Sequence, residues 1–302
     1  MSPQSRVGIA AMVAAIALTP LATPAAAAGF FHRKPAPAVA APPPLDATLT
    51  GIDQALSEAR LLDAGRLLDT ALASGVNDPR LILRAGELHL ARNRDDEAVR
   101  SFAQAESCAS CRAQALQGQG IALARLGRSD EAVSKLQAAV KADPALWRAW
   151  NALGVEKDRR KDWLASELAY AEALKSPAVT AIVLNNRGYS RLLQGRYDDA
   201  SADFVRALDK DPGLASARTN LRLSLALRGD YRRAVAVSGS EERGAVLNNA
   251  GFAAAMRGDL SEAETLFQQA IDARGNSYGR AIANLEMVRA LNKSSKPSVA
   301  QP

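Results

Sequence analysis

The 302-residue chain has few of the residues from which most catalytic and metal sites are built. It contains two histidines, two cysteines and 5% aromatic residues. With only His32 and His89, neither a metal cluster nor a histidine-based catalytic triad can be assembled within the chain. Phosphate-binding glycine loops and G-x-S-x-G turns are also missing from the sequence. We therefore expect no catalytic residue, no metal site and no cofactor.

Long runs of charge of one sign are also missing. The net charge is +6 with a pI near 9.5, yet acidic and basic residues alternate along most of the chain, as on a solvated surface. Ribonucleoprotein motifs, zinc-finger spacings and basic helices do not occur, so we expect no nucleic-acid partner. Alanine and leucine dominate the 48% of hydrophobic residues, which favours closely packed helices over sheets. The composition predicts an all-α fold.

The N-terminus has the order of features that is typical of a secretory signal peptide. One positive charge, Arg6, precedes an apolar run from Val7 to Leu18, and small residues follow up to Ala28. The apolar run is short for a bilayer-spanning helix. We predict a signal peptide at residues 1–28 and a periplasmic location without a stable membrane span after cleavage. An uncleaved N-terminal anchor that faces the periplasm is the alternative.

After the predicted signal peptide, both ends of the chain are expected to lack a packed core. Residues 29–44 are rich in proline, which offers no backbone donor to a helix or sheet, and predict a linker. Residues 293–302 are polar and lack hydrophobic periodicity, which predicts a disordered tail. The folded domain is expected at residues 45–292.

Four glycines of this domain occupy similar sequence contexts. Each lies between two amphipathic stretches, and the positions are Gly127, Gly195, Gly229 and Gly258. The interval from Gly127 to Gly195 is twice the interval from Gly195 to Gly229. Glycine accepts the left-handed backbone that ends a helix, and the acidic or polar residues that follow begin the next one. Each glycine therefore predicts the joint of a helical hairpin.

The shorter of these intervals, about 34 residues, is the period of the tetratricopeptide repeat, and the sequence resembles that repeat. One repeat places the signature residues at Trp150, Leu153, Gly154, Ser166, Tyr170 and Ala173, and the next at Leu184, Gly188, Ala200, Phe204, Ala207 and Pro212. The resemblance implies an α-solenoid of about seven helical hairpins. The last amphipathic stretch, "SYGRAIANLEMVRALNK", has no partner helix and is expected to cap the stack.

The repeat between Ala215 and Arg243 departs from the pattern in two ways. Its second helix is expected to be cut short by "SGSEERG", and Arg222 takes the place that is glycine in its neighbours. A hinge and an ordinary irregular turn are both compatible with this sequence.

Amide side chains recur at equivalent places on successive first helices. In such solenoids the first helices line a concave groove, which is the usual ligand surface. The candidate groove residues are Gln117, Asn151, Asn185, Asn186, Thr219, Asn220, Asn248, Asn249 and Asn284. Amides offer donors and acceptors together and can hold an extended peptide by its backbone. Alternatively, these amides hydrogen-bond to neighbouring backbone groups within the repeat, and the sequence leaves both roles open.

Alternation of charge fails between Gly213 and Val237, where arginines outnumber the single acid. Arg218 and Arg222 lie four residues apart and therefore on one helical face. They predict a basic patch that recognises an acidic segment of a partner, with solvated arginines as the alternative.

The only cysteines, Cys108 and Cys111, form the motif "CASC" at the expected turn between two repeats. In an exported protein this pair predicts a disulfide. Regular helix would hold the two Cβ atoms about 5–6 Å apart, whereas a disulfide needs about 3.5–4.5 Å. The bridge therefore requires a turn. Unpaired thiols and a redox site are the alternatives.

These features favour a non-catalytic periplasmic scaffold that binds a partner protein or its extended segment in the groove. The stretch "ASARTNLRLSLALRGDYRRAVAV" resembles the TadD-type proteins of the tight-adherence (Flp) pilus system, which implies a role in the assembly of a pilus, secretion or other envelope complex. An envelope enzyme or thiol-redox accessory that uses Cys108 and Cys111 is one alternative. A peptidoglycan-associated adapter is another.

Overall fold

The computed structural model describes residues 44–177, 181–237, 243–274 and 278–295. The expected signal peptide, residues 29–43 of the expected linker and residues 296–302 of the expected tail lie outside these ranges.

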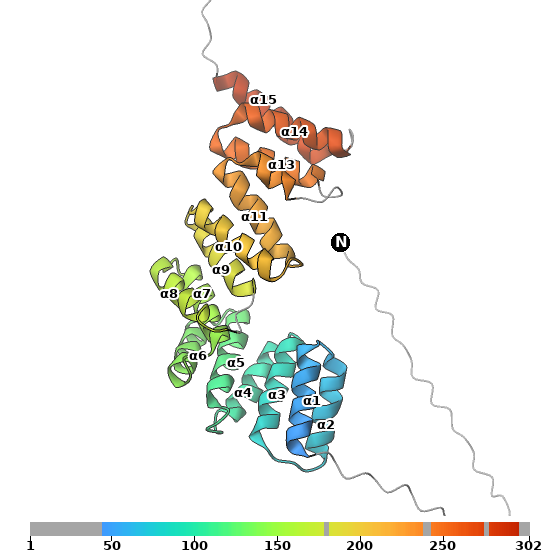
Figure 1. Cartoon of the computed structure of the whole chain (residues 1–302), viewed down its shortest axis with the longest axis vertical. Coiled ribbons are helices and arrows are strands. Elements are labelled where there is room, and N and C mark those ends of the chain that lie inside the picture. Colours follow the sequence, from blue (N-terminus) through green and yellow to red (C-terminus); the bar gives the residue numbers. More distant parts are fainter. Residues whose placement is uncertain (1–43, 178–180, 238–242, 275–277, 296–302) are drawn as a thin grey trace, which may run out of the picture. The chain divides into compact units, whose positions relative to one another are not determined.

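In the described ranges all regular structure is α-helical. The helices are α1 (Leu45–Ser57), α2 (Leu61–Ala73), α3 (Pro79–Ala91), α4 (Asp95–Ala105), α5 (Arg112–Arg125), α6 (Ser129–Ala142), α7 (Trp147–Arg159), α8 (Trp163–Ala173), α9 (Ala181–Leu193), α10 (Tyr197–Lys210), α11 (Ala215–Arg228), α12 (Tyr231–Ala236), α13 (Arg243–Arg257), α14 (Leu260–Arg274) and α15 (Gly279–Ser295). Consecutive helices pair into hairpins, each packed on the next (Figure 1). We call the odd-numbered helices from α1 to α13 the first helices of the hairpins and their partners the second helices. The predicted α-solenoid of helical hairpins is confirmed.

The hairpin joints have the left-handed backbone that the sequence predicted. The φ angles are 76° at Gly127, 75° at Gly195, 94° at Gly229 and 85° at Gly258. Three other joints reach the same conformation without glycine, with φ of 55° at Ala59, 57° at Asn93 and 57° at Lys161. From Ala59 to Gly229 these joints are evenly spaced, one repeat length apart. The turn is therefore imposed by the packing of the hairpin, and glycine only makes it easier to adopt.

Aspartates start some of the helices by accepting bonds from free backbone N–H groups. Asp162 accepts from the N–H of Ala165 at 3.3 Å, and Asp230 accepts from the N–H of Arg233 at 3.2 Å. Such caps satisfy donors that have no partner inside the helix.

Inside each regular hairpin a glycine of the first helix contacts one large side chain of the second helix, always at the same separation along the chain. The pairs are Gly86 with Phe102, Gly120 with Leu136, Gly154 with Tyr170, Gly188 with Phe204 and Gly251 with Phe267. A Cβ at Gly188 would lie 2.7 Å from Cε1 of Phe204, so no larger residue fits without movement. All five large side chains are fully buried. Each contributes about 1.5–3 kcal/mol of hydrophobic stabilisation, and the contact explains why the repeat signature has this spacing.

The first and sixth hairpins differ from the others at this contact. The first has Ile52 at the place of the glycine, and the sixth departs further. Its second helix, α12, has six residues and ends at Ala236, which confirms the predicted shortening. Arg222 stands at the place of the glycine, and position 238, where the other hairpins carry the large side chain, lies outside the described residues. Whether this hairpin acts as a hinge stays a hypothesis.

The last helix, α15, follows the final hairpin and covers it. It buries Ala281, Leu285 and Val288 in the core that α13 and α14 also form. The helix continues to Ser295, beyond the expected boundary at Asn292. The capping role predicted from the sequence fits this packing.

Candidate functional site

Asparagine side chains bond successive first helices to one another. Asn186 Nδ2 in α9 donates to Asn151 Oδ1 in α7 at 3.1 Å, and Asn220 Nδ2 in α11 donates to Asn185 Oδ1 in α9 at 3.0 Å. We name the set of asparagines that bond in this way from helix to helix the amide ladder. Its members are Asn151, Asn185, Asn186, Asn220, Asn248 and Asn284.

A further bond of this kind joins two helices at the C-terminal end of the domain. Asn284 Nδ2 in α15 donates to Asn248 Oδ1 in α13 at 3.0 Å. Asn248 Nδ2 also lies 3.5 Å from Oδ1 of Asn249, a predicted groove residue that is exposed. Each helix-to-helix bond uses one of the two N–H donors of an amide, and each carbonyl oxygen has a second lone pair. The ladder bonds thus join helices of the repeats, and the ladder member Asn248 is itself buried, with 3% of its surface exposed.

Two other predicted groove residues, Gln117 and Thr219, take no part in the ladder. Gln117 is buried, and its Oε1 accepts from the backbone N–H of Ala149 at 3.1 Å, which joins α5 to α7. For Gln117 the structure therefore gives the role toward neighbouring backbone that the sequence left open. Thr219 is exposed on α11, and its Oγ1 accepts from Nη2 of Arg222 at 3.2 Å.

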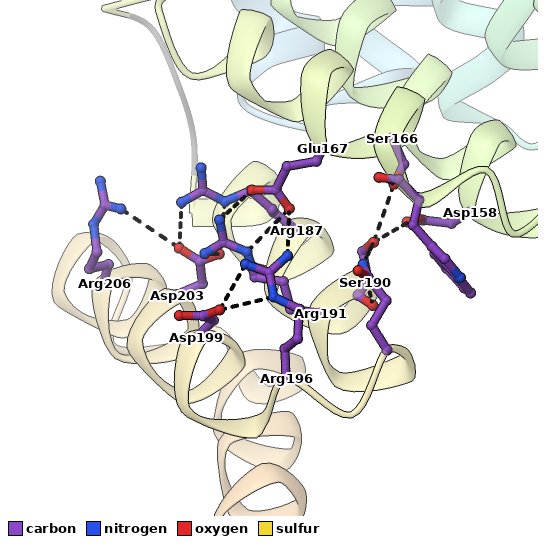
Figure 2. A network of polar contacts seen from close by, with 12 residues as sticks. Asp158, Ser166, Glu167, Arg187, Ser190, Arg191, Arg196, Asp199, Asp203 and Arg206 are labelled. Atoms are coloured by element: carbon purple, nitrogen blue, oxygen red, sulfur yellow. Dashed lines mark hydrogen bonds and ion pairs between the residues drawn. The ribbon is translucent and has the colours of Figure 1, made fainter.

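A buried ion-pair network fixes the rotation of α9, the helix that carries two members of the ladder (Figure 2). Its centre is Asp203 of α10, whose side chain is 2% exposed. Arg187 binds both carboxylate oxygens of Asp203, at 2.6 and 2.8 Å, and Arg191 Nη1 binds Oδ2 at 2.8 Å. Arg191 also bonds Glu167 of α8. Because Arg187 directly follows Asn186, these bonds hold α9 in the orientation that the ladder requires.

A second group of hydrogen bonds ties the end of α7 to the same region (Figure 2). Asp158 accepts from the hydroxyl of Tyr170 at 2.8 Å and from Ser190 Oγ at 2.6 Å. Burial, and then the charge of Asp158, raise the pKa of Tyr170 well above its usual range, so the hydroxyl stays a donor. The single histidine of the described residues, His89, lies on α3. The bonds of Asp158 join α7 to α8 and α9.

The predicted basic patch lies on α11. Arg218 Nη2 donates to the backbone carbonyl of Pro212 at 2.6 Å, and Arg222 Nη2 donates to Thr219. Both side chains are half-buried. Recognition of an acidic segment by this patch stays a prediction.

The two cysteines lie where the sequence placed them, in the turn between α4 and α5. They are unbridged thiols whose Sγ atoms are 2.6 Å apart. Hydrogen bonds with Cys111 and Ser110 lower the pKa of Cys108, whereas burial raises the pKa of Cys111. The disulfide stays a prediction.

A hollow of about 630 Å³, which the sequence did not predict, lies on the first helices of the N-terminal repeats. Its charged lining comes from α1, α3, α5 and α7 and includes Asp53, Arg84, Arg125 and Arg148. Arg84 binds Asp53 through two bonds of 2.9 and 2.7 Å. The three arginines occupy different positions within their repeats, so the repeat pattern gave no signal for this hollow.

Neither a metal-binding cluster nor a membrane-spanning helix is found in the described ranges. No three His, Cys, Asp or Glu side chains there are arranged to hold a metal ion. No helix there combines the length and apolar character that a membrane crossing needs.

Comparison with known proteins agrees with this architecture. A family model described as the tetratricopeptide repeat matches residues 118–155 and 156–215. Among curated proteins no match to the chain is found.

Several solved structures share the fold at low sequence identity. The crystal structure of the APC/C hetero-tetramer Cut9-Hcn1 superposes with a TM-score of 0.62 and 15% identity over 82% of this chain, which spans 50% of that chain. The C-terminal part of a repeat protein from Cytophaga hutchinsonii gives a TM-score of 0.55 and 16% identity, covering 78% of this chain and 99% of that one. YrrB, a tetratricopeptide-repeat protein described as having an unusual peptide-binding site, gives a TM-score of 0.50 and 16% identity. The match covers 63% of this chain and 100% of that one.

Proposed function

We propose that the chain, which a tetratricopeptide-repeat model matches over residues 118–155 and 156–215, is a non-catalytic scaffold that binds an extended segment of a partner protein along its first helices. Proteins of this family act in protein–protein interaction, and the amide ladder is the observation that carries the finer proposal. Its amides lie on α7, α9, α11, α13 and α15, and those that are only partly buried, all except Asn248, have further donors and acceptors for the backbone groups of a bound chain. The peptide-binding site named for YrrB supports a peptide as the ligand.

The site of action that we propose is the periplasm. The charge, apolar run and small residues of Met1 to Ala28 support export. The resemblance of residues 215–237 to TadD-type proteins supports a role in assembling a pilus, secretion or other envelope complex.

A thiol-redox accessory is the second candidate, favoured by the partly exposed Cys108 with its lowered pKa beside the buried Cys111. Replacement of both cysteines by serine separates the two functions. A scaffold keeps its partner and its biological role without the thiols, whereas a redox accessory loses the role.

Site-specific crosslinking in the native envelope tests the scaffold proposal. A photoreactive residue at Thr219, which is exposed beside the ladder, is expected to capture a partner protein. Substitution of Asn185 and Asn220 by Ala should reduce this capture. The matched control is Gln268→Ala, an exposed amide on the second helix α14. Equal capture by all variants, or none at Thr219, would contradict the proposal.

A further inference from the structure

The helices that carry the C-terminal part of the amide ladder also carry a row of exposed apolar side chains. Its members leave between 40% and 69% of their surface open to solvent. We name them the apolar row, and they are Tyr189, Leu193, Leu223, Phe252, Met256 and Met287. They come from the four successive helices α9, α11, α13 and α15.

This apolar row runs beside the amide ladder. Tyr189 follows the ladder residue Asn185 by four positions, and Phe252 follows the buried ladder residue Asn248 by four and the exposed Asn249 by three. Residues four apart lie on one face of a helix. A chain held by the amides would therefore meet the apolar side chains of the same helices.

The fold does not require apolar residues at these places. Each of the four N-terminal repeats has two residues at the places of Tyr189 and Leu193, and half of these eight residues are charged. The charged ones are Asp53, Glu87, Arg125 and Arg159, and the others are Ser57, Ala91, Ile121 and Val155. The same structural position thus accepts full charges. Exposed apolar side chains that packing does not need mark an interaction surface.

The charge around the row indicates an acidic ligand. Helices α9, α11 and α13 contain seven arginines and no aspartate or glutamate, and α15 has one glutamate among three basic side chains. Four of the seven arginines pair with acids of other elements: Arg187 and Arg191 with Asp203, Arg228 with Asp198 and Asp230, and Arg257 with Asp259. Arg218, in contrast, donates to the uncharged carbonyl of Pro212 at the turn before α11.

The spacing of the helices indicates the periodicity of the ligand. Packed helices lie about 8–10 Å apart. An extended chain of the polyproline II type advances about 3.1 Å per residue and presents the same face every three residues. About three residues of such a chain therefore span one helix of the row to the next, and about ten residues span all four helices.

We propose that the apolar row and the amide ladder together bind an extended acidic segment of a protein partner that carries an apolar side chain at every third residue. This inference rests on the proposed function and specifies the chemistry of its ligand. The chain's own ends do not fit this description. Residues 29–44 contain Arg33 and Lys34 and no acid, and residues 296–302 contain Lys296 and no acid.

Fluorescence polarisation with a labelled ten-residue peptide tests the inference on the exported chain. The probe has Leu at positions 1, 4, 7 and 10, with Asp, Glu and Ser between them. One control peptide has the same composition with Leu at alternate positions, and a second has Lys in place of the acids. We expect the probe to bind at least tenfold more tightly than either control.

The decisive variant is Phe252→Ser with Met256→Ser, two exposed residues four apart on α13. Its matched control is Leu164→Ser with Leu168→Ser, which are also exposed and four apart but lie on the second helix α8. We expect the α13 variant to weaken probe binding at least tenfold and the α8 variant to leave it unchanged, with unaltered circular dichroism in both. Equal effects of the two variants, or no preference among the peptides, would overturn the inference.

Two further results separate this inference from the proposed function. A partner that is crosslinked from Thr219 but is still captured by the α13 variant would leave the scaffold proposal standing and refute the apolar row as its contact. Self-association that disappears in the α13 variant, measured by sedimentation, would show that a second copy covers the row and would also refute the acidic segment.

Discussion

Three hairpin joints hold side chains in a backbone conformation that suits glycine. Ala59, Asn93 and Lys161 have φ between 55° and 57°, at the places that glycine occupies in the other hairpins. A left-handed residue with a Cβ costs about 1–2 kcal/mol. Because these residues accept the conformation, the packed helices on either side must supply the free energy that holds it.

Replacing Lys161 by Gly is therefore expected to stabilise the fold. The relief of strain is partly offset by the greater freedom of glycine in the unfolded chain, so the net gain should be about 0.5–1 kcal/mol. The denaturant midpoint measures it. The reverse change, Gly195→Ala at the joint of the following hairpin, should lower the midpoint. A lower midpoint for Lys161→Gly would contradict this explanation.

The two thiols should differ in reactivity. The thiolate is the reactive form, the pKa of Cys108 is lowered by its hydrogen bonds with Cys111 and Ser110, and the pKa of Cys111 is raised by burial. In the reduced protein, iodoacetamide is expected to label Cys108 first at neutral pH, with a rate that falls as the pH is lowered. Mass spectrometry of timed samples measures the order. Equal labelling of both cysteines would refute the asymmetry.

At the scale of the helices, the ion pairs around Asp203 contribute more than those at the surface. Asp203 is 2% exposed and faces Arg187 and Arg191, which are 12% and 14% exposed. Removing one partner of a buried ion pair leaves uncompensated charge in a medium that solvates it poorly. These bonds hold α9 against α8 and α10, so their loss affects the ladder as well as the stability.

Asp203→Asn is expected to lower the free energy of unfolding by about 3–5 kcal/mol. The control is Asp199→Asn on the same helix, whose ion pair with Arg196 is about half exposed and should contribute about 0–1 kcal/mol. Urea denaturation followed by circular dichroism compares the two. Similar midpoints for both variants would show that the buried network does not stabilise α9.

How far the sequence predicts these elements depends on whether a feature repeats. Gly127 and Gly195 recur in register and therefore predict the joints, and "SGSEERG" predicts the short α12 because it interrupts a known period. The asparagines were found for the same reason. The pairing of Asp203 with Arg187 was not, because it occurs in one repeat and depends on how two helices are rotated against each other.

Gln117 illustrates the same limit at the candidate site. Its amide lies on a first helix near the expected row, and sequence spacing alone does not distinguish it from the ladder. Only the packing of α5 against α7 turns the side chain inward to the N–H of Ala149. Gln117 lies one repeat length before Asn151, at the same position of the repeat, so the spacing cannot show that its side chain is buried while that of Asn151 is partly exposed.

At the scale of the whole molecule, the stack depends on the helix that closes it. A solenoid end exposes the face that would pack against a further repeat, and a capping element covers it. A chain that stops at Arg274 would expose the core residues that contact Ala281, Leu285 and Val288. We expect a lower melting temperature and increased binding of a hydrophobic dye. A chain that stops at Ser295 keeps α15 and is the control. Equal melting temperatures would refute the capping role.

The short helix α12 also bears on how the protein responds to load. In a linear array each hairpin packs only against its neighbours. Helix α12 buries only Tyr231 and Ala234 of its six residues. Tension applied through the two ends of the domain passes through every hairpin in series. We expect the sixth hairpin to unfold first, so that stretching lengthens the molecule at this hairpin while the flanking hairpins stay folded.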